Sequence, residues 1–186
     1  RFSKDPLIEI YAERISKSSA IGIDRVKPST LGERLGDEIS LINSKIIQGK
    51  YKFTAYKEKL ISKGYNSKPR QISIPTVRDR ITLRALCECL GDVYPEAKLK
   101  LPHIAIETLK EKLSSGEFSE FAKIDLQGFY PSIPHKLVLG STWKRIRKIE
   151  IRSLIRSAIT TPTVPESKTS KGLKPTAIGV PQGLAV

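Results

Sequence analysis

Several residue types are scarce in this sequence. Its 186 residues include no methionine, two cysteines, two histidines and one tryptophan. Cys87 and Cys89 are too close together to form a useful disulfide, and they lack the further ligands of a zinc site. We expect buried thiols in a reducing compartment and predict a cytoplasmic location. Because the chain has no methionine and begins at Arg1, we also expect it to be a trimmed fragment.

Long hydrophobic runs are missing too, and acidic residues are few. No apolar run approaches membrane-spanning length, and no signal-peptide pattern opens the chain. The sequence has 19 Asp and Glu against 33 Lys and Arg, a net charge of +14. This excess predicts an anionic partner, either nucleic acid or an acidic membrane surface. A membrane surface is disfavoured because no expected helix pairs a basic face with large aromatic anchors.

What is present describes an ordinary globular domain or part of one. Hydrophobic residues make up 39% of the chain and charged residues 28%. Apolar residues at helical spacing predict helices over residues 5–16, 30–48, 77–90, 104–113, 134–139 and 143–159. Residues 51–61 and 71–74 read as two strands of a hairpin whose tip lies at 64–69. The fold class predicted from these elements is α+β.

A further strand is expected at residues 121–126, and it carries a single carboxylate, Asp125. Gly128 and Pro131 then end any extended pairing. A lone acid at the end of a buried strand is costly to desolvate unless a cation meets it. One interpretation is an aspartate that caps the following turn. The other is a ligand of Mg²⁺, which prefers carboxylates together with substrate phosphates.

Three motifs stand in a fixed order along the chain. The first is Lys68-Pro-Arg-Gln-Ile-Ser-Ile-Pro, which continues to Arg80; the second is Ile124-Asp-Leu-Gln-Gly-Phe-Tyr; the third is Ile178-Gly-Val-Pro-Gln-Gly. Their order and spacing resemble those of bacterial reverse transcriptases, a group that includes retron-like, abortive-infection-like and group II intron enzymes. The resemblance covers nearly the whole chain, from Gly22 to Val186.

The resemblance implies a right-hand polymerase fold, truncated before its paired-aspartate motif. Residues 1–120 would form the fingers, with the basic hairpin at about 50–76. Residues 121–186 would form the first part of the palm, with a helical insertion at about 134–160. The activity implied for the parent is RNA-directed DNA synthesis on an RNA template, from a DNA or RNA primer, with deoxynucleoside triphosphates.

The resemblance also implies a nucleotide site. Arg70 would contact the phosphates of the incoming nucleotide, with Lys63 beside it, and arginine suits this task because its planar fork donates two hydrogen bonds. Gln182 would touch the nucleotide and Gly183 would allow close backbone approach. Tyr130 would lie beneath the sugar and exclude a 2′ hydroxyl. In a continuing strand Phe129 would face the core and Tyr130 the site.

The metal site that the resemblance implies needs more carboxylate ligands than this sequence supplies. Asp125 would be catalytic and would bind Mg²⁺ (or Mn²⁺) together with the backbone carbonyl of Leu126. Two-metal phosphoryl transfer needs several carboxylates, and no aspartate follows Asp125 in the sequence. The fragment alone is therefore predicted to be inactive.

Basic residues at several places are candidates for nucleic-acid contact: Lys57, Lys59, Lys68, Arg78, Arg80, Lys144 and Arg145. Two roles are equally plausible for Arg78, Arg80 and Arg84. They could contact the template backbone, or they could be solvated partners of Asp79 and Glu88. Trp143 could stack on a base or belong to the core. The alternative function is a non-catalytic nucleic-acid-binding module in which Asp125 is structural.

Overall fold

The structure combines helices with one small sheet. It is a computed structural model that describes residues 1–62, 64–65, 69–98, 101–166 and 177–184. The helical elements are α1 (Lys4–Ile10), a π-helical turn η1 (Tyr11–Ile15), α2 (Pro28–Gly32), α3 (Leu35–Ile47), α4 (Val77–Val93), a 3₁₀ turn η2 (Pro95–Ala97), α5 (Pro102–Ser114), α6 (Phe129–Ser132), α7 (His135–Arg145) and α8 (Ile149–Thr160). The strands are β1 (Tyr56–Ile61), β2 (Arg70–Ile74) and β3 (Thr163–Val164). The α+β class is confirmed.

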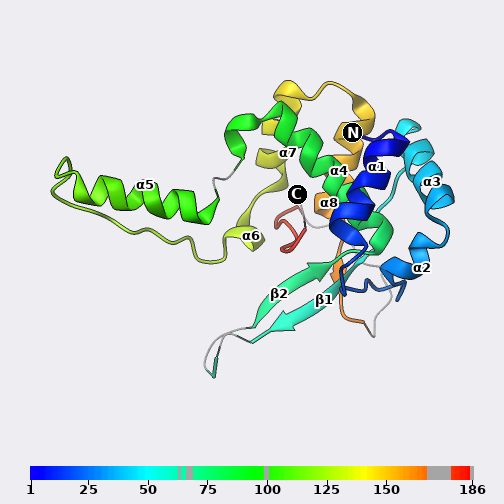
Figure 1. Cartoon of the computed structure of the whole chain (residues 1–186), viewed down its shortest axis with the longest axis horizontal. Coiled ribbons are helices and arrows are strands. Elements are labelled where there is room, and N and C mark those ends of the chain that lie inside the picture. Colours follow the sequence, from blue (N-terminus) through cyan, green and yellow to red (C-terminus); the bar gives the residue numbers. More distant parts are fainter. Residues whose placement is uncertain (63, 66–68, 99–100, 167–176, 185–186) are drawn as a thin grey trace.

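The sheet has the strand order β2-β1-β3 and extends from the helical body (Figure 1). β1 and β2 pair antiparallel, with Lys57 opposite Ile74 and Ile61 opposite Arg70, so the predicted hairpin is confirmed. β3 adds to β1 in parallel. The first strand starts later than predicted: residues 51–55 are not paired as a strand. Their alternate side chains, Tyr51 and Phe53, are instead buried in the core.

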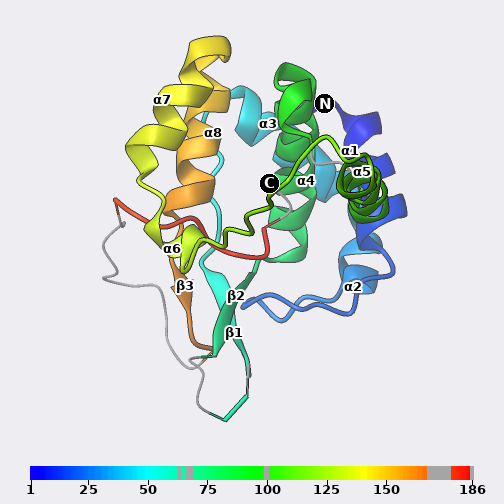
Figure 2. The same cartoon turned by 90° about the vertical axis from the view of Figure 1, so that its left-hand side faces the viewer.

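One hydrophobic core joins α1, α3, α4, α7 and α8. Figure 2 shows these helices gathered at one end of the sheet. Tyr56 at the start of β1 is fully buried there, and its hydroxyl donates to the carbonyl of Ala158 in α8 at 2.9 Å. That bond satisfies the polar end of a large apolar side chain, as a buried tyrosine requires. The hairpin is thus fixed at its base to the helices, while its far end extends into solvent.

The helix expected from residue 30 to 48 is two helices, so that prediction is wrong in its continuity. α2 ends at Gly32 and α3 begins at Leu35. Gly32 has no side chain, and Tyr11 packs in the space a Cβ would occupy, with its hydroxyl donating to the carbonyl of Pro28 at 2.9 Å. This contact packs η1 against both ends of α2. The predicted end of α3 at Gly49, which has a φ of +64°, is confirmed.

The strand predicted at 121–126 is absent, and this prediction is wrong. These residues are irregular and exposed; Ile124 keeps 85% of its surface accessible and Leu126 keeps 65%. A strand is stabilised when neighbours accept its backbone hydrogen bonds, and in the described part of the chain no strand lies beside this segment. The apolar composition has the strand pattern but lacks the pairing partner that would bury it.

The other predicted helices all exist, but they begin and end at residues that differ from the predicted ones. The last two predicted segments, 134–139 and 143–159, are divided instead at residues 146–148, between α7 and α8. Trp143 packs against the core from α7, and the guanidinium groups of Arg152 and Arg156 lie 5.4 and 5.2 Å from its ring centre. None of the helices in the described ranges is both long and apolar enough to cross a membrane.

Candidate functional site

Residues 177–184 bring the three sequence motifs together. Val180 donates its backbone N–H to the carbonyl of Tyr130 at 2.8 Å, and Ser73 in β2 donates to the carbonyl of Gln182 at 2.7 Å. One short segment is therefore hydrogen-bonded to α6 at one end and to the hairpin at the other. Figure 2 shows it running between these two elements.

Glycines make the close approach of this segment possible. Gly183 has a φ of +97°, and a Cβ built on it would lie 2.8 Å from Cγ2 of Ile72 and 3.3 Å from the carbonyl oxygen of Ser73. Gly179 has a φ of +93°, and a Cβ there would lie 3.2 Å from the carbonyl oxygen of Pro131. A larger residue would be strained at both positions and would push the segment from its neighbours. The close approach at Gly183 is to the backbone and side chains of strand β2.

A buried histidine fixes the other end of the segment. His135 is 5% exposed at the start of α7, and its Nε2 lies 2.6 Å from the carbonyl oxygen of Gly179. Its backbone N–H donates to the carbonyl of Ala177 at 3.0 Å. The sequence analysis missed this residue. A histidine 44 positions before its partner belongs to no recognisable local pattern.

The proposed nucleotide-contact residues lie on these joined elements. Arg70 is the first residue of β2 and is exposed, and Gln182 is half-buried in the bridging segment. Lys63 and Lys68, also predicted to bind, lie outside the described residues.

The prediction that Phe129 and Tyr130 face opposite sides of a continuing strand is wrong. Gly128, with a φ of +64°, turns the chain into the helical turn α6, so the two residues do not alternate across a strand. Phe129 is 49% exposed and not a core residue, Tyr130 is 43% exposed, and their rings meet edge to face at 5.7 Å. Tyr130 likewise lies outside the hydrophobic core.

Asp125 and Leu126 precede α6 in the exposed segment. In the described ranges, no three His, Cys, Asp or Glu side chains come together as a group that could hold a metal ion. Asp125 and the Leu126 carbonyl therefore supply at most one carboxylate and one carbonyl ligand. The described residues alone do not fit a two-metal centre.

On the hairpin, the two described basic candidates differ. Lys57 forms an ion pair with Glu166 at 2.9 Å, and Arg25 approaches the same carboxylate at 3.5 Å. The hydrogen bond from Lys57 holds the pKa of Glu166 below its usual range. Lys59, two residues along, is exposed. Lys59 is thus the better placed of the two to meet an external anion.

The other basic candidates make internal contacts to different degrees. Arg78 pairs with the buried carboxylate of Glu38, and this hydrogen bond raises the pKa of Arg78. Arg145 lies 2.6 Å from Glu96 and 4.8 Å above the ring of Tyr94. Lys144 is also exposed but forms no ion pair within the described residues. The internal contacts leave Lys144 as the more available cation at the end of α7.

Asp79 and Glu88, the expected partners of the α4 arginines, behave differently. Glu88 pairs with Arg84 at 3.3 Å. Asp79 is buried and instead accepts hydrogen bonds from the Tyr51 hydroxyl at 2.8 Å and the Thr54 N–H at 3.0 Å. Burial raises the pKa of Asp79. Asp79 is therefore a structural carboxylate that ties residues 51–54 to α4.

Comparison with known proteins finds a distant relative. The chain is 28% identical over 192 aligned residues to Protein YkfC of Escherichia coli (strain K12), an alignment that covers 92% of this chain and 48% of that protein. The chain thus spans about half the length of this curated relative. No protein-family model matches the sequence.

Proposed function

We propose that this chain is part of a bacterial-type reverse transcriptase, with residues 1–120 as fingers and 121–186 as the first part of the palm. The observation that carries the proposal is the junction at residues 177–184, which joins Tyr130 of the second motif to β2 of the first. Residues of three motifs that resemble one enzyme family in sequence are thus joined by backbone hydrogen bonds. The net charge of +14 is in keeping with an RNA template and a DNA or RNA primer as partners.

In this proposal the chain's own residues bind and orient a deoxynucleoside triphosphate. Arg70 donates its guanidinium fork to the phosphates from the first residue of β2, opposite Ile61 at the far end of the hairpin. Tyr130 offers its ring to the sugar, and Gln182 contacts the nucleotide from the bridging segment. Positioning and charge stabilisation are the main contributions that a protein makes to phosphoryl transfer.

Asp125 and the Leu126 carbonyl would contribute to Mg²⁺ or Mn²⁺ binding in the complete protein. When bound, such an ion supplies Lewis-acid stabilisation of the transferring phosphate. The described residues do not complete its ligand set, so no step is assigned to the metal here. The fragment of 186 residues is accordingly expected not to incorporate nucleotides.

The test is primer extension by the complete gene product on a poly(rA) template with an oligo(dT) primer. We expect Asp125→Asn to abolish synthesis and leave duplex binding intact, because it keeps the shape and removes the charge. Glu120→Gln, which removes an exposed carboxylate nearby, is the matched control and should stay active. Arg70→Ala should raise KM for the nucleotide and lower kcat as well. Normal synthesis by Asp125→Asn would overturn the proposal.

Tyr130 gives a second test, of sugar discrimination. Tyr130→Val should lower the ratio of kcat/KM for deoxyribonucleotides over ribonucleotides, whereas the matched Phe129→Val should leave it unchanged. Both rings are similarly exposed, so the two variants differ mainly in which ring is removed. An unchanged ratio in the Tyr130 variant, with the protein folded, would remove Tyr130 from the nucleotide site.

The second candidate function is a non-catalytic nucleic-acid-binding module. The exposed, isolated position of Asp125 favours it, since in the described residues no other carboxylate joins it to form a metal site. This module would bind an RNA/DNA duplex with a steep salt dependence and show no synthesis even as the complete gene product. Primer extension therefore separates the two functions.

A further inference from the structure

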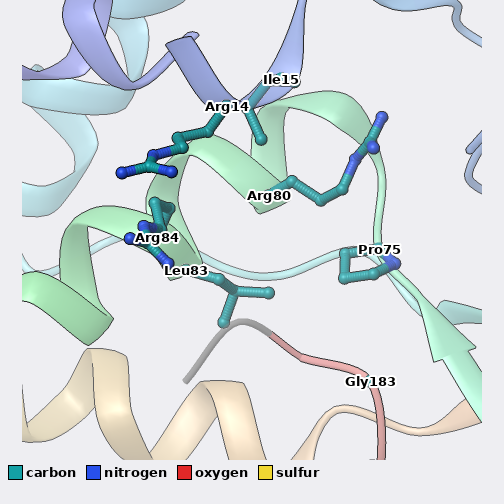
Figure 3. Close-up of a pocket in the computed structure, with 7 residues that line it drawn as sticks. All are labelled: Arg14, Ile15, Pro75, Arg80, Leu83, Arg84 and Gly183. Carbon is teal, nitrogen blue, oxygen red and sulfur yellow. The ribbon is translucent and has the colours of Figure 1, made fainter. Parts of the chain in front are cut away.

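A pocket of about 260 Å³ lies beside Gly183 of the bridging segment. It is enclosed by η1, by one face of α4, by Pro75 after β2 and by Gly183 (Figure 3). Since one water molecule takes up about 30 Å³ in the liquid, this volume admits a group larger than a single water.

Three arginines line the pocket, namely Arg14, Arg80 and Arg84. Figure 3 shows the guanidinium groups of Arg14 and Arg84 at one end and that of Arg80 directed to the other. They come from η1 and from successive turns of α4. Like charges gathered at one cavity repel each other, so this arrangement is stabilised when an anion enters.

Within the described ranges, the carboxylates near Arg14 and Arg84 leave guanidinium N–H donors of both arginines without an acceptor. Arg84 uses its Nε to bond Glu88 at 3.3 Å, and Glu88 is shared with Arg1 at 3.5 Å. Arg14 reaches only the exposed Glu13, at 4.0 Å. Among the described residues, neither arginine has a hydrogen-bond acceptor for its terminal Nη groups. Two guanidinium forks are thus open at the same end of the pocket.

Arg80 is held in place by neutral groups. Its Nη atoms donate to the Ser18 hydroxyl at 2.6 Å and to the carbonyl of Ala20 at 2.8 Å, while its buried Nε has no acceptor in the described part of the chain. No carboxylate of the described residues lies within ion-pair distance of it. Burial lowers the pKa of Arg80, which records the cost of keeping this charge away from water.

The rest of the lining is apolar or has no side chain. Ile15, Pro75 and Leu83 exclude water from one wall, and Gly183 contributes backbone alone. Electrostatic attraction is stronger beside such a wall than in open water. The pocket therefore combines cationic donors with a low-dielectric surface.

We propose that this pocket binds a phosphate group through the forks of Arg14 and Arg84, with Arg80 adding positive charge from the other end. Arginine forks match phosphate oxygens in pairs, which favours phosphate over a monovalent halide. The phosphate can come from a nucleic-acid backbone or from a free phosphate such as pyrophosphate. The pocket shares Gly183 with the bridging segment but is lined by neither Arg70 nor Tyr130. Its phosphate chemistry does not depend on polymerase activity.

The first experiment titrates the 186-residue chain with pyrophosphate at constant ionic strength and follows backbone amides by NMR. We expect saturable shifts at Ile15, Leu83, Arg84 and Gly183. The double variant Arg14→Gln/Arg84→Gln should weaken pyrophosphate binding by about tenfold or more, since two charge-assisted donors are lost. Arg80 is left intact because its bonds to residues 18 and 20 support the fold.

The matched control is Lys45→Gln/Arg147→Gln, which removes the same net charge from two exposed side chains outside the pocket. It should change the affinity by less than about twofold, because screened distant charges contribute little. Equal weakening in the two double variants, or shifts that never saturate, would overturn the proposal in favour of diffuse charge. Unchanged thermal melting of both variants shows that fold is not the cause.

A second experiment separates the two phosphate sources. If the phosphate belongs to a nucleic-acid backbone, pyrophosphate should compete with an RNA/DNA duplex, and the Arg14/Arg84 double variant should lower the salt slope of duplex binding by about two. If it is a free phosphate, pyrophosphate should bind equally well in the presence of saturating duplex. Either result supports a phosphate site. If the pocket variant binds pyrophosphate as tightly as the control variant does, the phosphate-site proposal is overturned. Primer extension tests the polymerase proposal independently.

Discussion

Helices α4 and α5 have similar amphipathic sequences and opposite surroundings. α4 buries seven residues, among them Ile81, Leu83, Ala85 and Leu86, which are at most 1% exposed. α5 buries none: Ile106 and Leu109 keep 53% and 54% of their surface accessible. Figure 1 shows α4 inside the helical body and α5 projecting from it.

The difference teaches what helical periodicity determines. It specifies which side of a helix is apolar, and it carries no information on whether another surface lies against that side. α4 is stabilised by packing, by the Thr76 side chain that caps its first turn and by the Asp79 network. α5 has 13 residues and no such support, and isolated helices of about this length are marginal in water.

Hydrogen exchange should give the largest contrast between the two helices. Amides in the middle of α4, such as that of Leu86, should exchange only through near-global unfolding, with an opening free energy of roughly 5–15 kcal/mol. Those of α5, such as that of Leu109, should open at close to zero cost. Native-state exchange measured by NMR compares them within one sample. Strong protection of α5 that disappears on dilution would show that a second copy covers it.

Truncation of one leucine in each helix should give the next largest effect. Leu86→Ala should lower the free energy of unfolding by about 2–5 kcal/mol, because it leaves a cavity in a fully buried site. Leu109→Ala, the matched exposed change, should stay within about 0.5 kcal/mol of the wild type. Urea denaturation followed by tryptophan fluorescence reports both. Similar losses in the two variants would mean that α5 packs on the body in solution.

The same contrast explains which sequence predictions hold. The existence of the hairpin, the end of α3 at Gly49 and the existence of α4 follow from local chemistry, because turns, caps and alternating strands are encoded by nearby residues. The strand at 121–126 fails because a strand needs partners. Ile124 and Leu126 satisfy the pattern, but in the described residues nothing pairs with them.

The candidate site divides in the same way. Motif resemblance predicts Arg70, Gln182 and Gly183 as site residues, and in the structure they lie on elements joined by the Ser73–Gln182 hydrogen bond. His135 and Arg14 were missed, since their relation to residues 179 and 84 is long-range and leaves no local signal. Sequence predicts the members of a motif, whereas contacts between distant segments emerge only in the fold.

The pH dependence of stability should reveal the buried carboxylate of α4. Burial raises the pKa of Asp79 above its ordinary value of 3.8, so the folded state holds this proton more tightly than the unfolded state. Its contribution to stability is then complete below the unfolded pKa and is lost as pH rises through the folded pKa. Asp79→Asn removes this titration. The substitution should also lower the free energy of unfolding by about 1–3 kcal/mol. Tyr51 and Thr54 each donate to a different oxygen of Asp79, whereas asparagine has one acceptor oxygen and an NH₂ that cannot accept.

Denaturation of the wild type and Asp79→Asn from pH 3.5 upward tests this sign. The stability advantage of the wild type over the variant should shrink as pH rises. Glu111→Gln, on exposed α5, is the control and should follow the wild-type profile at every pH. A wild-type advantage that grows with pH would mean that the hydrogen bonds from Tyr51 and Thr54 outweigh burial.

The smallest contrast is expected from one alanine in each helix. Ala85→Gly should lower the free energy of unfolding by about 1–2 kcal/mol, the sum of roughly 1 kcal/mol of helix propensity and about 0.8 kcal/mol for the buried methyl group. Ala105→Gly, on exposed α5, costs the same propensity but acts on a helix that is not coupled to the core. Its urea midpoint should therefore match the wild type, while circular dichroism at 222 nm should show less helix before unfolding begins. If Ala105→Gly instead shifted the midpoint and left the native helix signal unchanged, α5 would be folding together with the core, and the contrast with α4 would be wrong.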